Sequence, residues 1–245
     1  MRTLITFATL FPATALAAPV GSPIADPETG RLAVVGTLDT ESRVLADTDC
    51  SGDDCEAARI PVGWGGRINV NLLRGVGVFV DTASVNESIA GAGYTAAGST
   101  QGGGVRLALP ITPKWYLAAT AQVERGNAEG SSDWDEDVEG SEVDGTGAWQ
   151  HARAALTAAI HPDESFTFYA GPTYGLTYTH EAAVASDATD FDFEAVTPVG
   201  AVAGFEVFSN RLSLPWSPLR THLTLGVEGR YEGGFGLGVW TGLGF

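Results

Sequence analysis

The sequence has little basic charge, with Lys+Arg 13 against Asp+Glu 30 and a formal net charge of −17 over 245 residues. Lys114 is its one lysine. Proteins that bind nucleic acids need a basic face to displace the counterions of the phosphates, so this class is excluded. Long apolar runs are also lacking. Beyond the first residues none approaches the roughly 18 residues that a transmembrane helix requires.

The first residues form a targeting segment. Met1-Arg2 supplies a positive start, Leu4 to Leu16 is a short apolar stretch, and small residues precede a cleavage point after Ala17. This pattern predicts a secretory signal peptide over residues 1–17. Cysteine is scarce. Because the mature chain would enter an oxidising compartment, we expect Cys50 and Cys55, the only two, to form a disulfide.

The rest of the chain alternates in polarity with a period of two, which is typical of β-strands. In the last segment one parity is mostly apolar and the other is rich in glycine: Phe235, Leu237, Val239, Thr241, Leu243 and Phe245 against Gly236, Gly238, Trp240, Gly242 and Gly244. Similar alternation predicts ten strands, at about 31–45, 59–73, 75–82, 102–109, 115–125, 148–160, 165–180, 196–208, 220–231 and 234–245.

The predicted connectors alternate in length. Short ones, such as 74–75, 110–114 and 161–165, alternate with longer ones at about 46–58, 83–101, 126–147 and 181–195. Short turns alternating with long loops, on antiparallel strands with one apolar face, are typical of a transmembrane β-barrel. In lipid such a sheet must close, because an open edge leaves backbone groups without hydrogen-bond partners. We therefore expect an all-β, closed antiparallel transmembrane barrel of about ten strands, with eight as the alternative.

The chain resembles the small outer-membrane β-barrels of Gram-negative bacteria. The resemblance is carried by the signal peptide, the alternating strands, the loop asymmetry and the end of the last strand, where Val239, Thr241, Leu243 and Phe245 match the pattern that the barrel-assembly machinery reads. It implies a monomer in the cell outer membrane, in contact with membrane lipid and lipopolysaccharide. It also implies a periplasmic segment at 18–30 and a barrel at 31–245. A secreted lipocalin-like barrel is the soluble alternative, but such barrels carry their apolar residues inside.

Charged residues of the strands share the parity opposite to the apolar face. A charge that faces lipid costs about 2–4 kcal/mol at the midplane, so these side chains are expected to line the lumen. The predicted lumen-lining residues are Asp39, Glu41, Arg43, Arg67, Asp81, Arg106, Glu124, Arg153, Glu206, Glu228 and Arg230. Two interpretations stay open: a salt-bridged plug that fills the barrel, and a water-filled polar channel. Inward glycines leave room either for arginines of the opposite wall or for water.

A candidate metal site lies in the first long connector. Asp47, Asp49, Ser51 and Asp53 place oxygen atoms at alternate positions, as in the first half of a calcium loop of the EF-hand kind. The twelfth position holds Ala58, where that loop needs a bidentate glutamate. A surface Ca²⁺ site and a disulfide-pinned acidic loop are the two interpretations, and no other cofactor is expected.

No catalytic constellation is evident. A hydrolase needs a serine near a histidine that a carboxylate orients, and none of the four histidines has such neighbours in the predicted arrangement. We therefore expect no enzyme, but an envelope barrel with a structural or interaction role. A narrow, porin-like passive pore is the first alternative, and a lipid-modifying outer-membrane enzyme is the second.

Overall fold

The computed structural model describes residues 32–41, 43–47, 56–90, 94–132, 143–163, 165–184, 189–195, 198–212 and 221–245. Nearly all of them lie in β-strands. Within these ranges no helix is long and apolar enough to cross a membrane. The predicted signal peptide at 1–17, the segment at 18–30, and both cysteines lie outside the described residues.

The strands are β1 (Leu32–Glu41), β2 (Arg43–Asp47), β3 (Glu56–Leu73), β4 (Val76–Ala90), β5 (Tyr94–Pro110), β6 (Trp115–Ser132), β7 (Val143–Asp163), β8 (Phe166–Val184), β9 (Thr189–Ala195), β10 (Val199–Leu212), β11 (Thr221–Tyr231) and β12 (Phe235–Gly244).

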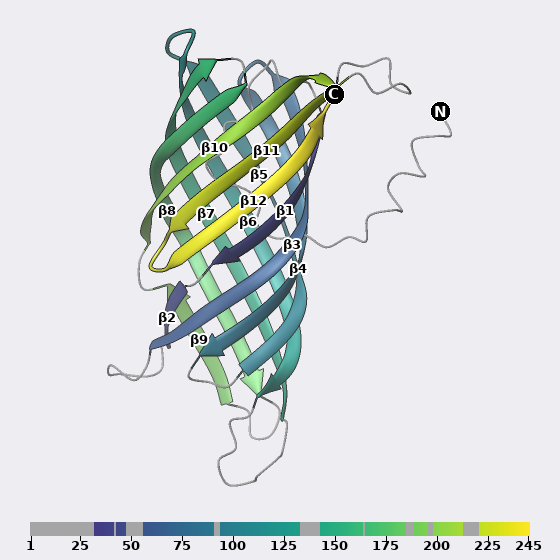
Figure 1. Ribbon diagram of the computed structural model, residues 1–245. Coiled ribbons are helices and arrows are strands. Elements are labelled where there is room, and N and C mark those ends of the chain that lie inside the picture. Colours follow the sequence, from purple (N-terminus) through teal and green to yellow (C-terminus); the bar gives the residue numbers. More distant parts are fainter. Residues whose placement is uncertain are drawn as a thin grey trace.

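Ten of these strands close a barrel (Figure 1). Neighbours around the wall pair antiparallel in the order β1-β3-β4-β5-β6-β7-β8-β10-β11-β12, and β12 pairs with β1 to complete the ring. The predicted all-β, closed antiparallel barrel of ten strands is thereby confirmed. Closure leaves no sheet edge with unpaired backbone groups along the ten-stranded part.

Toward the loop end the wall changes from ten strands to eight. β1 and β2 follow one another along β3, and β9 and β10 follow one another along β8. Nearer the short turns, the β11–β12 hairpin lies between β1 and β10. Beyond the hairpin turn, toward the loop end, β2 pairs directly with β9. We call the ring at the loop end, formed by β2 and by β3 to β9, the eight-stranded extension. In Figure 1 β2 and β9 lie beyond the turn of the yellow hairpin, at the end opposite the C-terminus.

The turn of this hairpin depends on one glycine. Gly233 has a φ of 80°, in the left-handed region that residues with a Cβ rarely adopt. The turn is closed by the N–H of Glu232, which donates to the carbonyl oxygen of Gly234 at 3.1 Å. This tight turn ends the hairpin well before the loop ends of β3 to β8. At that level the wall changes from ten strands to eight.

Much of what the sequence predicted as long loops is strand. β4 continues to Ala90 and β5 starts at Tyr94, so only 91–93 remain of the connector predicted at 83–101. The connector predicted at 126–147 shortens to 133–142, and β9 lies inside the one predicted at 181–195. The prediction failed there because the polarity reverses: the outward side chains of this part of β4 are polar and the inward ones are Ala83 and Val85.

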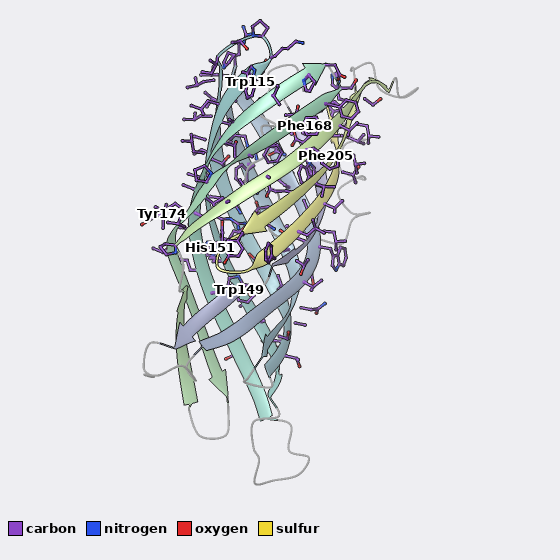
Figure 2. All side chains as sticks on the ribbon, turned by 60° about the vertical axis from the view of Figure 1, so that its left-hand side comes forward. Trp115, Trp149, His151, Phe168, Tyr174 and Phe205 are labelled. Atoms are coloured by element: carbon purple, nitrogen blue, oxygen red, sulfur yellow. The ribbon has the colours of Figure 1, made fainter. Side chains whose placement is uncertain are left out.

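The two faces of the ten-stranded wall differ sharply. Large apolar side chains point outward on every wall strand, including Leu38, Trp64, Val80, Leu107, Trp115, Leu156, Phe168, Phe205, Leu225 and Leu237. Figure 2 shows Trp115, Phe168, Phe205 and Tyr174 standing out from the barrel. The inward parity carries the buried charges. Only a solvent of low polarity matches this arrangement, since water would favour the opposite one.

Candidate functional site in the lumen

The structure places the described members of the predicted lumen set inside the barrel. Each side chain is at most 9% exposed, and Glu206 and Glu228 are fully buried: Asp39, Arg67, Asp81, Arg106, Glu124, Arg153, Glu206, Glu228 and Arg230. The backbones of Glu41 and Arg43 belong to β1 and β2, while their side chains lie outside the described residues. Parity along each strand therefore located the interior charges.

One chain of polar contacts begins on β3. The Arg67 guanidinium donates from Nε and Nη2 to Asp81 Oδ2, at 3.2 and 2.8 Å, and from Nη2 to Gln122 Oε1 at 3.2 Å. The Gln122 amide in turn donates to Glu124 Oε1. Strands β4 and β5 separate β3 from β6 in the wall, so the Arg67–Gln122 bond passes through the lumen instead of along the sheet.

The same chain continues to the opposite wall through Arg153 on β7. Its Nη2 donates to Glu124 Oε1 at 3.5 Å, and its Nη1 lies 3.8 Å from Glu232 Oε2. Glu232 stands in the turn of the β11–β12 hairpin, with β8 and β10 between it and β7. The predicted strands at 220–231 and 234–245 leave Glu232 in the turn between them, but its side chain is 5% exposed and faces the lumen.

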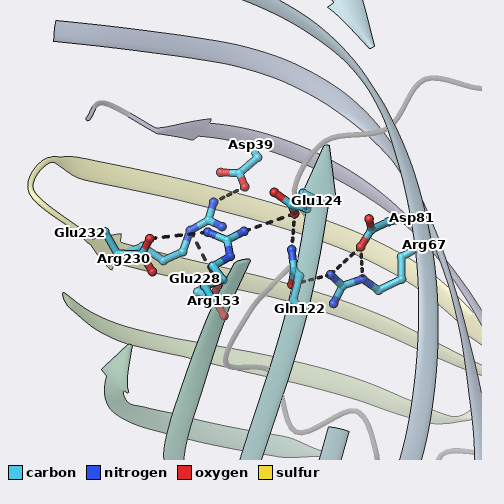
Figure 3. Close-up of polar contacts among 9 residues, drawn as sticks. All are labelled: Asp39, Arg67, Asp81, Gln122, Glu124, Arg153, Glu228, Arg230 and Glu232. Atoms are coloured by element: carbon cyan, nitrogen blue, oxygen red, sulfur yellow. Dashed lines mark hydrogen bonds and ion pairs between the residues drawn. The ribbon is translucent and has the colours of Figure 1, made fainter. Parts of the chain in front are cut away.

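A second chain lies beside the first (Figure 3). Arg230 on β11 donates to Asp39 Oδ2 on β1, and its Nε lies 3.8 Å from Glu228 Oε1. The Tyr169 hydroxyl, from β8, donates to Glu228 Oε2 at 2.8 Å. We call the two chains together the charged belt. It comprises Asp39, Arg67, Asp81, Gln122, Glu124, Arg153, Tyr169, Glu228, Arg230 and Glu232.

Arginine also packs on an aromatic ring inside the barrel. Cζ of Arg67 lies 3.7 Å from the centre of the Phe79 ring, and Cζ of Arg106 lies 5.4 Å from it. A guanidinium over an aromatic face gains about 0.5–2 kcal/mol, more when water is excluded. The Phe79 ring therefore lies close to two guanidinium groups and stabilises both charges.

An apolar layer lies inside the barrel on the short-turn side of the belt. It consists of Val35, Ala159, Tyr169, Val202 and Trp240, with Tyr116 packed against it. Trp240 lies two residues beyond Gly238, the partner of belt residues Asp39 and Glu228. At 1% exposed, Trp240 is one of the largest fully buried side chains. The sequence analysis expected a polar lumen and did not foresee this layer.

Inward glycines make room for these rings. Four inward aromatic residues each pair with a glycine of the neighbouring strand, where a Cβ would overlap the ring: Phe79 with Gly104, Trp149 with Gly126, Tyr169 with Gly204, and Trp240 with Gly226. The predicted alternatives for this space were arginines or water. Arg230 does lie beside Gly238, but at these four positions an aromatic side chain of the adjacent strand uses the space.

The buried ion pairs of the belt contribute to the stability of the wall. Removing one partner of a buried ion pair costs about 3–5 kcal/mol, because it leaves the other charge without compensation. The belt draws on β1, β3, β4, β6, β7, β8 and β11, seven of the ten wall strands. Its contacts thus tie together distant parts of the ring.

The predicted calcium ligands fall outside what the structure describes. β2 ends at Asp47, whose side chain is not described, and Asp49, Ser51 and Asp53 follow it. Among the described residues no three His, Cys, Asp or Glu side chains come together as a metal site.

The described histidines lie apart from one another. His151 on β7 is buried in the lumen, and its Cα partner across the sheet is Glu124. His161 contacts the Tyr116 ring, with centroids 4.6 Å apart, and its Nδ1 lies 2.9 Å from the Thr167 hydroxyl. The side chain of His180 is outside the described residues.

The residues proposed as an assembly signal lie on one face of the barrel. Val239, Thr241 and Leu243 alternate with the buried inward residues of β12. The N–H of Phe245 donates to the carbonyl oxygen of Leu32 at 2.8 Å, which joins the last residue to the first described strand.

Comparisons with known proteins show similarity of fold. No protein-family model and no curated protein matches the sequence. Among solved structures, the translocator domain of the autotransporter NalP from Neisseria meningitidis is similar, with a TM-score of 0.52, 11% identity, and 88% of each chain covered. The transport unit of the autotransporter AIDA-I from Escherichia coli gives a TM-score of 0.45 at 10% identity, covering 88% of this chain and 90% of that one. The outer-membrane protease OmpT from Escherichia coli gives 0.43 at 8% identity, covering 92% and 96%. At these identities the chain shares with NalP a β-barrel fold.

Proposed function

We propose that the chain is an integral outer-membrane β-barrel whose lumen is sealed, and that it serves a structural or interaction role in the cell envelope. The observation that carries the proposal is the charged belt, whose contacts cross the lumen from β3 to β6 and from β7 to the hairpin turn. Such a barrel meets other molecules through its outer surface and its loop end.

The outer face supports the location. Apolar side chains cover the outside of the ten-stranded part while charges are enclosed, and this is the arrangement that a bilayer stabilises. The signal peptide and the terminal pattern of Val239, Thr241, Leu243 and Phe245 are the proposed routes to the envelope and to the barrel-assembly machinery. Lipid, lipopolysaccharide and divalent cations are the proposed contacts, with the barrel as a monomer.

The contacts across the lumen favour a sealed barrel over a passive pore. A water path would have to pass both the charged belt and the apolar layer of Val35, Tyr169, Val202 and Trp240. The lipid-modifying enzyme is the weaker alternative, since His151, whose Cα partner across the sheet is Glu124, is enclosed within the barrel.

Planar-bilayer recording of the refolded mature chain tests the proposal. Flotation with vesicles and resistance of the folded band to unfolding in detergent first establish that the barrel has inserted, and a general porin serves as the positive control. We expect no steady current from inserted protein. Stable, stepwise conductance would overturn the sealed lumen and favour the pore.

A further inference from the structure

The outward face of β4 to β7 changes from apolar to polar part of the way along each strand. The change falls between Val80 and Thr82 on β4 and between Gly103 and Gln101 on β5. It falls between Val123 and Arg125 on β6, and on β7 between Leu156 and Gln150, with two alanines between them. Thr82, Gln101, Arg125 and Gln150 are exposed and pair in sequence across the four strands. We call them the boundary residues.

Below the boundary residues the strands have the length of a bilayer crossing. On β6 the stretch from Trp115 to Glu124, and on β7 the stretch 151–160, are ten residues each. A transmembrane β-strand needs about 9–11 residues. Since β6 has 18 residues and β7 has 21, both strands continue well past that length.

Arg125 is the one outward-facing base among the strand side chains that the structure describes. An arginine on the lipid face costs about 2–4 kcal/mol at the midplane and about 0–1 kcal/mol near the interface. Glu129, four residues farther along β6 on the same face, is also exposed. These two charges cannot lie in hydrocarbon without that cost, whereas a guanidinium at the surface can bind lipid phosphate.

Aromatic residues on the other side of the barrel give a second, independent indication of the membrane interface. Where the hairpin turns, the outward Tyr231 and Phe235 rings contact each other edge to face, with centroids 5.2 Å apart. Tyr174 projects outward from the same part of the wall (Figure 2). Aromatic girdles mark the two interfaces of a membrane barrel.

The boundary residues and the aromatic residues near the hairpin turn lie at the same height along the barrel axis. Gln150 pairs with Thr179, but the aromatic residue on β8 is Tyr174, five residues nearer the short turns. Strands of a membrane barrel tilt by about 35–45°, so a level plane crosses successive strands at successively shifted registers. The shift from Gln150 to Tyr174 has the direction that the strand tilt requires. Continued around the barrel, a plane perpendicular to the barrel axis reaches Tyr231 and Phe235 at the hairpin turn.

We propose that the phosphate-bearing headgroup layer of the outer leaflet meets the barrel along the boundary residues and the hairpin turn, and that the eight-stranded extension stands outside the bilayer. The wall thus narrows where it leaves the membrane. The outer face of the extension, including Ser84, Asn86, Ser99 and Asn127, is small, polar and mostly uncharged. This inference rests on the proposed outer-membrane location.

Single-site labelling in matched pairs tests the inference. In a Cys50→Ser/Cys55→Ser background, an environment-sensitive fluorophore is attached after Val105→Cys or Ala97→Cys on β5, and after Ala121→Cys or Asn127→Cys on β6. All four positions are outward and exposed. Proteins refolded into vesicles are exposed to phosphatidylcholine with nitroxides on its acyl chains and, separately, to iodide in the buffer.

We expect the nitroxide lipid to quench the labels at 105 and 121 several times more strongly than those at 97 and 127, with the reverse order for iodide. Strong nitroxide quenching at all four positions would overturn the boundary and leave the membrane location standing. Iodide quenching at all four would overturn the membrane location itself. The two failures are therefore distinguishable.

Discussion

At the scale of single residues, the interior depends on glycines opposite aromatic rings. Trp240 is buried because Gly226, its partner on β11, leaves the space that the indole takes. The next glycine of β11, Gly229, faces outward, and a Cβ there would have no neighbour closer than 3.9 Å. Replacement of glycine by alanine would thus place the added methyl group against a ring on the inner face of β11 and in open space on its outer face.

Gly226→Ala is expected to lower the free energy of unfolding by about 1–3 kcal/mol, because the added methyl group overlaps the Trp240 indole in a filled interior. Gly229→Ala is the matched control, and we expect it to leave stability unchanged or to raise it by about 0.4–1 kcal/mol through reduced entropy of the unfolded chain. Urea unfolding of the barrel refolded in vesicles, followed by tryptophan fluorescence, measures both. Equal effects of the two substitutions would contradict the pairing.

The sequence predicted the interior charges and missed the interior rings for one physical reason. Parity along a single strand decides which face a residue takes, so Arg67, Arg153 and Glu228 could be assigned without a structure. The partner of Trp240 is set by register between strands, which requires the turn geometry and the pairing of the whole hairpin. Glu232 was missed similarly, because a residue in a turn has no strand parity.

At the scale of elements, the wall is built from strands of two lengths. β10, β11, β12 and β1 have 10 to 14 residues, while β3 and β5 to β8 have 17 to 21. Beyond the hairpin turn, the edges of β3 and β8 would have unpaired backbone groups if no further strand paired with them. The pairing of β2 with β9 satisfies those groups and closes the extension. β9 was not predicted, although Phe191 and Phe193 alternate with Asp190, Asp192 and Glu194, because this acidic segment was assigned to a long connector.

Ala46→Pro is expected to open the extension while leaving the ten-stranded barrel folded. Ala46 pairs with Glu56 of β3 and with Glu194 of β9, and proline removes its N–H from the ladder. One lost hydrogen bond of about 1 kcal/mol corresponds to about fivefold faster amide exchange in β9. Hydrogen exchange read by mass spectrometry measures it, with Ala46→Ser, which keeps the N–H, as the control. Unchanged protection of β9 in the proline variant, or equal loss in the serine variant, would argue against the closing role of β2.

At the scale of the whole molecule, the interior combines two kinds of contact. The charged belt joins the walls through ion pairs and hydrogen bonds, and the apolar layer packs its side chains on the short-turn side. The two differ in physical character, because water can enter among charged groups that have lost their partners but is excluded from apolar packing. In the sealed barrel that we propose, a continuous water path therefore requires that both be breached.

Two double substitutions and their combination test this double seal. Arg153→Ala/Glu232→Ala removes both partners of the contact between β7 and the hairpin turn, which avoids leaving either charge of that pair alone. Val202→Ala/Trp240→Ala removes two side chains of the apolar layer that are not members of the belt. In planar bilayers we expect no steady current from either double variant and stepwise conductance from the fourfold one, since only the last has gaps in both layers. Folding is checked by the resistance of each barrel to unfolding in detergent, and Val202→Ala/Trp240→Leu replaces the alanine pair if that variant does not fold. Steady conductance from the Arg153→Ala/Glu232→Ala variant alone would mean that the belt is the whole seal, and a silent but folded fourfold variant would mean that the lumen is closed by more than these two layers.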